Sequence, residues 1–128
     1  MACPLFLPVS PLGDLPGDGV PLGDVYGGEC AASSGTLIPI GMLRSCCNFG
    51  YARDACAQAG TINADASRFL VKSDRGGVVE IAWSTERNHL PVAVGTLRVE
   101  QSAAPDPGPL DRQARAYATS YMRRTGRA

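Results

Sequence analysis

The sequence has 128 residues, which suits one domain spanning residues 1–128, and its 45% hydrophobic and 19% charged residues are ordinary for a globular protein. Twelve Lys and Arg residues balance twelve Asp and Glu residues, so the net charge gives no reason to expect a nucleic-acid or membrane partner. No apolar run approaches the ~20 residues of a membrane-spanning helix, and the opening of the chain lacks the charged region of a signal peptide, so we expect a cytoplasmic protein.

The first part of the chain, residues 1–60, is rich in residues that interrupt regular structure. Residues 1–40 hold six of the ten prolines and seven of the fifteen glycines, and they show neither a helical nor a strand period. Apolar residues recur throughout this stretch, which argues against simple disorder. A short helix is expected at 39–48, and further helical turns at 51–59. The sequence therefore predicts an irregular segment that wraps over another part of the molecule.

Residues 67–100 alternate between apolar and polar side chains, as half-buried strands do. Two turn sequences, at residues 74–77 and 87–89, divide this region into three runs. The apolar positions of the three runs are Phe69 and Val71, then Val79, Ile81 and Trp83, then Val92, Val94 or Ala93, Leu97 and Val99. This pattern predicts a three-stranded antiparallel meander.

After a Pro-rich linker at 101–109, a helix is predicted from Leu110 to near Arg124. Its apolar stripe consists of Leu110, Ala114, Tyr117, Ala118 and Tyr121. The predicted fold class is α+β, with the meander packed with a C-terminal helix and preceded by an irregular Cys-rich metal-binding half. Because one helix leaves much of a sheet uncovered, we expect the Cys-rich segment to cover the second sheet face, stabilised by a metal.

Five cysteines, Cys3, Cys30, Cys46, Cys47 and Cys56, are the main chemical feature of the chain. Disulfides rarely persist in the cytoplasm, so clustered thiols there indicate metal binding or redox chemistry. Four thiolates are the number that structural zinc and iron–sulfur clusters use, although no Cys-x-x-Cys pair is present.

The preferred ligand set is Cys3, Cys30, Cys47 and Cys56. Adjacent cysteines point about 100° apart on a helix, so Cys46 and Cys47 are not expected to bind the same ion. Cys46 lies four residues after Met42 and is expected to pack against it, with a role as the alternative ligand left open.

Widely separated ligands from irregular chain favour an iron–sulfur cluster of the 4Fe–4S type, because such a cluster must be wrapped by backbone. The expected function is electron transfer, or a small subunit of a redox complex with a protein partner, and no catalytic acid–base set is present. The alternative is a zinc-stabilised protein-interaction module. A third hypothesis is a thiol redox protein that uses Cys46, Cys47 and Cys56.

The stretch Cys47-Asn48-Phe49-Gly50-Tyr51-Ala52, followed by Cys56, resembles a motif of small uncharacterised bacterial proteins. They combine such a segment with an early Met-x-Cys-Pro start, and the Gly76-Gly77 hairpin and the helical stretch at 113–117 are similar as well. The resemblance implies that the cysteines act together and implies no particular reaction. Cys46 departs from the pattern, which leaves the choice between Cys46 and Cys47 open.

Charged and titratable residues outside the cysteines have simpler interpretations. Residues 1–43 carry only acidic charges and residues 111–128 mostly basic ones, so the two ends either face each other or lie in solvent. A docking surface formed by Arg112, Arg115 and Arg123 is the alternative. The single histidine, His89, is expected in a surface turn, and Glu80 and Glu86 are expected to be solvated strand residues.

Overall fold

The computed structural model describes residues 2–12, 22–32, 38–51, 56, 63–100 and 108–125. The helical turns predicted at 51–59 and the linker predicted at 101–109 lie mostly outside these residues. Among the described residues, no helix has the length and the apolar content needed to cross a membrane.

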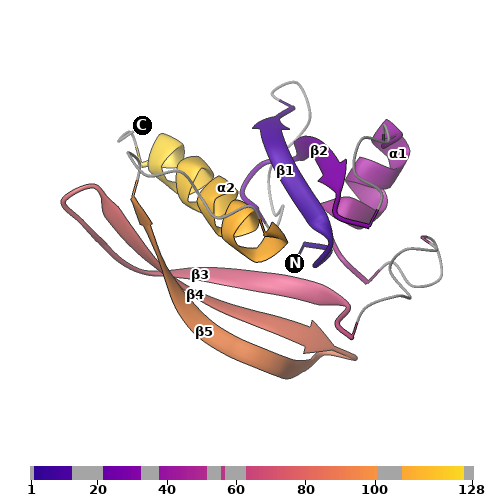
Figure 1. Cartoon of the computed structure of the whole chain (residues 1–128). Coiled ribbons are helices and arrows are strands. Elements are labelled where there is room, and N and C mark those ends of the chain that lie inside the picture. Colours follow the sequence, from indigo (N-terminus) through magenta and orange to yellow (C-terminus); the bar gives the residue numbers. More distant parts are fainter. Residues whose placement is uncertain are drawn as a thin grey trace.

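The predicted meander is confirmed as a three-stranded antiparallel sheet of β3 (Ala66–Arg75), β4 (Val78–Arg87) and β5 (Leu90–Glu100) in that order (Figure 1). Two-residue loops, 76–77 and 88–89, join the strands, and all four loop residues have positive φ angles of 52–82°. This is the conformation of the tight hairpin turn whose twist matches that of the strands. The predicted turns therefore set the register of the sheet.

The predicted helix is also confirmed, as α2 (Pro109–Arg124), with a proline in its first turn. The helix is buried more widely than its apolar stripe predicts, because Gln113, Ala116, Ser120 and Met122 are buried as well. These extra positions are needed because α2 contacts the sheet on one side and a second pair of strands on the other.

For the described residues of the N-terminal part, the prediction of an irregular segment is wrong, whereas the short helix predicted at 39–48 is present. The N-terminal part contains an antiparallel hairpin of β1 (Phe6–Pro11) and β2 (Tyr26–Cys30). The short helix α1 (Ile40–Met42) continues directly into the π-helical turn η1 (Leu43–Cys47). Among the described strands, β1 pairs with β2 alone, so the missing N–H of a proline can face away from the ladder and two prolines are tolerated.

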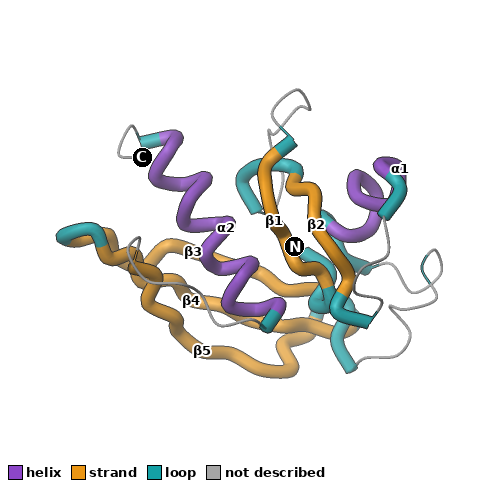
Figure 2. The backbone as a smooth tube through the Cα atoms, turned by 45° about the horizontal axis from the view of Figure 1, so that its top comes forward, coloured by secondary structure: helices purple, strands orange, loops and turns teal. Residues whose placement is uncertain are grey.

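The hairpin and α2 lie side by side on the same face of the sheet (Figure 1, Figure 2). The expectation that the Cys-rich segment covers the second sheet face is therefore wrong for the described residues. On that second face, Leu70 and Val94 are 65% and 71% exposed. The segment packs against α2 instead, since Phe6, Leu22 and Tyr26 join one core cluster with the helix and the inner face of the sheet.

Candidate metal centre

Cys3 lies in a tight turn at the start of the hairpin. The amide of Phe6 donates a hydrogen bond to the carbonyl of Cys3 (2.9 Å), and Pro4 takes the second turn position, where its fixed φ suits the bend. Burial raises the pKa of the Cys3 thiol, while a hydrogen bond from the backbone of Leu5 acts in the opposite direction. The turn therefore holds Cys3 Sγ in a buried place with one N–H donor directed at it.

Cys30 is brought to this turn by strand pairing. It is the last residue of β2 and lies opposite Phe6, the first residue of β1. The pairing continues beyond Cys30, because the amide of Ala31 donates to the carbonyl of Leu5 (2.8 Å). Cys3 and Cys30 therefore lie at the same end of the hairpin, although 26 positions separate them in the sequence.

Cys46 and Cys47 come from the π-helical turn η1, which is tied to the same end of the hairpin. The amide of Cys3 donates to the carbonyl of Cys47 (3.0 Å). Cys46 is buried, its Sγ lies 4.0 Å from Sδ of Met42, and Cys56 packs against it. The expected packing of Cys46 against Met42 is confirmed.

The cysteines are close enough to influence one another electrostatically. Burial raises the pKa of the Cys47 thiol to about 12, and the charges of Cys3, Cys46, Cys30 and Cys56 add to the increase. A negative charge on any of these neighbours disfavours ionisation of Cys47. All five are free thiols.

The structure thus gathers the preferred ligands Cys3, Cys30, Cys47 and Cys56 in one region, together with Cys46. Among the described residues, no three or more His, Cys, Asp or Glu side chains are arranged so that they could hold a metal ion. The thiols are neighbours without having the orientation of ligands around one centre.

Asn48 is a buried residue that the sequence analysis did not single out. Its side-chain carbonyl accepts from the amide of Tyr26 (2.9 Å), and its side-chain amide donates to the carbonyls of Tyr26 (3.0 Å) and Leu43 (2.8 Å). The side chain is fully buried, and it links the first residue of β2 to the first residue of η1. Asn48 therefore fixes the strand that bears Cys30 relative to the turn that bears Cys47. In the sequence, the indication of a structural role was its position directly after Cys47, within the stretch that resembles the bacterial motif.

Gln113 of α2 was missed as well. It is fully buried, and its side-chain amide donates to the carbonyls of Cys3 (2.7 Å) and Phe6 (2.8 Å), the two ends of the cysteine turn. Its Oε1 has no hydrogen-bond partner among the described residues. Gln113 lies one turn from Leu110 and beside Ala114, so its place next to the apolar stripe was the only signal of burial.

Tyr51 connects the cysteine segment to the β4–β5 turn. Its hydroxyl donates to Oε1 of Glu86 (2.6 Å) and accepts from the amide of His89 (2.9 Å), whose ring stacks on the Tyr51 ring at 4.5 Å. Glu86, expected to be solvated, has a side chain only 7% exposed and also contacts Arg68 (3.3 Å). That expectation is wrong because Tyr51 covers the carboxylate. His89 is exposed in its turn, as expected.

The acidic and basic ends of the chain face each other where the structure describes them. Asp24 pairs with Arg123 and accepts from the hydroxyl of Ser120 (2.6 Å), and Arg124 donates to the carbonyl of Gly23. Arg123 is therefore engaged within the chain, which weakens the alternative of a docking surface that includes it.

Comparisons with known proteins add no assignment: no family model matches, and neither the curated proteins nor the solved structures include a significant match. The fold and the site define a small α+β protein with a cluster of five thiols. The resemblance to the bacterial motif proteins stays a prediction.

Proposed function

We propose that this protein binds an iron–sulfur cluster of the 4Fe–4S type through Cys3, Cys30, Cys47 and Cys56, and that it acts in electron transfer or as a small subunit of a redox complex. The observation that carries the proposal is the convergence of cysteines from three separate elements. The turn before β1, the end of β2 and the turn η1 meet through backbone hydrogen bonds and strand pairing.

The electrostatics of the region support a cationic occupant. Burial raises the pKa of the Cys3 thiol and raises that of the Cys47 thiol to about 12, so both favour the protonated form unless a positive centre compensates the thiolate charge. Metal binding releases those protons and makes the free energy of binding part of the free energy of folding. Ligation requires the thiols to turn toward a common centre, because their present orientation does not hold an ion.

Two further features fit a cluster that exchanges electrons with a partner. The hydrogen bond from the backbone of Leu5 to the Cys3 sulfur is of the kind that tunes cluster potentials. Cys30, Cys47 and Cys56 are half-buried and not fully enclosed, so the site lies near the surface. Ile40 and Phe49, which flank η1, are 58% and 38% exposed and offer apolar area to a redox partner.

The test is purification of the full chain without oxygen, followed by iron and sulfide analysis and electron paramagnetic resonance. We expect broad visible absorption and about four iron atoms per chain. Protein that stays colourless and iron-free after anaerobic reconstitution would exclude the cluster.

The adjacent cysteines provide a matched pair of variants. Cys47→Ser should lose the cluster, whereas Cys46→Ser should keep it, since Cys46 packs against Met42. The reverse result would assign the ligand role to Cys46 and leave the cluster itself intact.

The second candidate is a zinc-stabilised interaction module that uses the same thiols. It is favoured by the uncovered sheet face, where Leu70 and Val94 are each more than half exposed. About one zinc ion per chain, with unfolding by a chelator, would select this candidate.

A further inference from the structure

A cavity of about 280 Å³ lies between α2 and the β1–β2 hairpin. Eight residues line it: Pro8, Val9, Pro11, Tyr26, Arg112, Arg115, Ala116 and Thr119. Its volume is close to the lower end of the range of small-molecule sites, so it suits a small ligand. None of the eight is acidic, and none is a cysteine, so this cavity is separate from the candidate metal centre.

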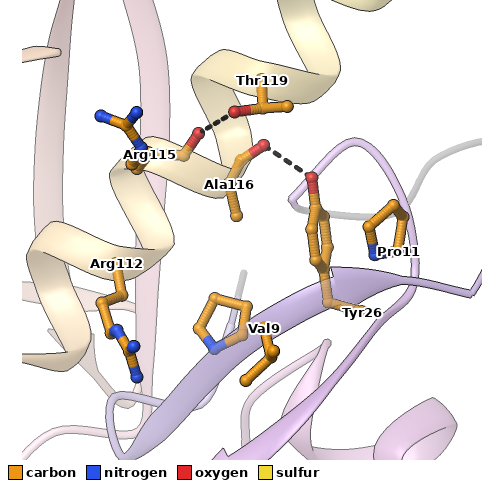
Figure 3. A pocket seen from close by; sticks show the side chains of 8 residues that line it. Val9, Pro11, Tyr26, Arg112, Arg115, Ala116 and Thr119 are labelled. Carbon is orange, nitrogen blue, oxygen red and sulfur yellow. Dashed lines mark hydrogen bonds between the residues drawn. The ribbon is translucent and has the colours of Figure 1, made fainter. Parts of the chain in front are cut away.

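The two hydroxyl groups of the cavity already have partners within the fold. The Tyr26 hydroxyl donates to the carbonyl of Ala116 (2.9 Å), and that of Thr119 donates to the carbonyl of Arg115 (2.9 Å). Figure 3 shows both bonds along one side of α2. These groups fix the wall of the cavity and have no hydrogen to offer a ligand.

The two arginines differ in how they are held. Arg115 donates to the carbonyl of Glu100 (2.9 Å), and in Figure 3 its guanidinium points away from Tyr26. Arg112 reaches from α2 toward the strand that carries Val9 (Figure 3). Within the described parts of the chain, the Arg112 guanidinium has neither a hydrogen-bond nor an ion-pair partner. Its N–H groups are therefore the donors that remain for a ligand.

We propose that this cavity binds a small organic anion, whose carboxylate or phosphate group lies on Arg112 and whose apolar body lies on Pro8, Val9 and Pro11. The planar guanidinium matches either acid group with two parallel hydrogen bonds. Arg115 adds positive charge to the same cavity, and none of the described lining residues is a carboxylate that could compete for Arg112. The proposal does not depend on the cysteines.

The probes are benzoate, phenyl phosphate, and benzyl alcohol as the neutral counterpart, each titrated into the full chain. Binding is followed by the methyl NMR signals of Val9 and Thr119, which line the cavity. We expect saturable shifts with at least one anion and none with benzyl alcohol. The stronger of the two anions identifies the acid group, and equal shifts with the neutral probe would overturn the proposal.

Two matched pairs of variants locate the site. Arg112→Gln should weaken anion binding at least about tenfold, since a charge-assisted pair is lost, while Arg98→Gln on β5 should change it less than about twofold. Val9 is 64% exposed, so its substitution leaves the core intact. Val9→Asp should abolish binding by charge repulsion, and Val9→Asn should retain it. Unaltered binding in Arg112→Gln and Val9→Asp, or no saturable shift with either anion, would refute the site.

Discussion

Replacement of Asn48 with leucine tests whether the buried amide holds the cysteine elements together. The side chain is fully buried and makes three hydrogen bonds, two to the backbone of Tyr26 and one to the carbonyl of Leu43. Leucine has a similar volume and makes none of them. The carbonyl of Leu43 still accepts a hydrogen bond from the backbone amide of residue 48 (3.2 Å). The buried backbone amide and carbonyl of Tyr26 are therefore the groups that lose a hydrogen-bond partner.

The expected loss follows from these two backbone groups. Each buried polar group left unpaired costs about 1–3 kcal/mol, so Asn48→Leu should lower the free energy of unfolding by about 2–6 kcal/mol. That is a large part of the ~5–15 kcal/mol of a typical domain. The loss is read from urea unfolding followed by the fluorescence of Trp83, the only tryptophan.

Asn63→Leu is the matched control for this substitution. Asn63 is exposed and accepts one surface hydrogen bond from Arg87 (2.9 Å), so the expected change is within about 0.5 kcal/mol. If Asn48→Leu cost no more than this control, the claim that Asn48 fixes β2 to η1 would be wrong.

Three further substitutions test other contacts. Gly95→Ala places a Cβ 2.6 Å from Cζ2 of Trp83, so we expect a loss of about 1–3 kcal/mol and altered Trp83 emission, and unchanged emission would argue against the close contact. Gln113→Met keeps the volume but removes two hydrogen bonds to backbone carbonyls, so urea unfolding should show a loss of about 1–3 kcal/mol. Burial acts to raise the pKa of Glu86, but hydrogen bonds from Tyr51 and an arginine lower it below its ordinary value. Glu86 thus adds stability above its unfolded-state pKa of about 4.3, and this stability is lost as the pH falls through the lower folded-state pKa. Tyr51→Phe should weaken the dependence of the urea midpoint on pH in this acidic range, and an unchanged dependence would contradict the bond.

The meander and the C-terminal helix could be predicted because their signals are local. Alternating apolar residues and the turn residues at 76–77 and 88–89 specify strand, turn and register within a few positions of one another. The spacing of the apolar residues likewise predicts the helix, as at Leu110, Ala114 and Tyr117. None of these elements needs a distant residue to define it.

The β1–β2 hairpin could not be predicted, because its two strands are defined by each other. Proline and glycine obscure the strand period in β1 and β2, and the pairing joins Phe6 to Cys30 across a long connection. At Gly28 the two strands lie so close together that a Cβ there would be 2.0 Å from the carbonyl oxygen of Leu7. A glycine that permits close packing looks the same in the sequence as one that ends a strand.

The burial of particular polar residues could not be predicted from the sequence either. Glu86, Asn48 and Gln113 are polar, and residue type alone places polar side chains in solvent. Each is buried because a distant partner satisfies it, Tyr51 for Glu86 and the backbone of the cysteine elements for the two amides. The sequence could therefore identify the cysteines as candidate ligands, but it could not identify the residues that position the elements carrying them.

The Asn48 variant finally separates fold stability from the positioning of the thiols. A ligand that binds only the folded state adds the same increment to any variant whose site is unchanged. Zinc is a suitable probe, because it binds thiolates whatever the natural cluster is. Since Asn48 joins the elements that carry Cys30 and Cys47, we expect zinc to stabilise Asn48→Leu by less than it stabilises Asn63→Leu. Equal increments would mean that Asn48 supports the fold without placing the cysteines, and that the β1–β2 pairing and the backbone hydrogen bond between Cys3 and Cys47 suffice to bring the thiols together.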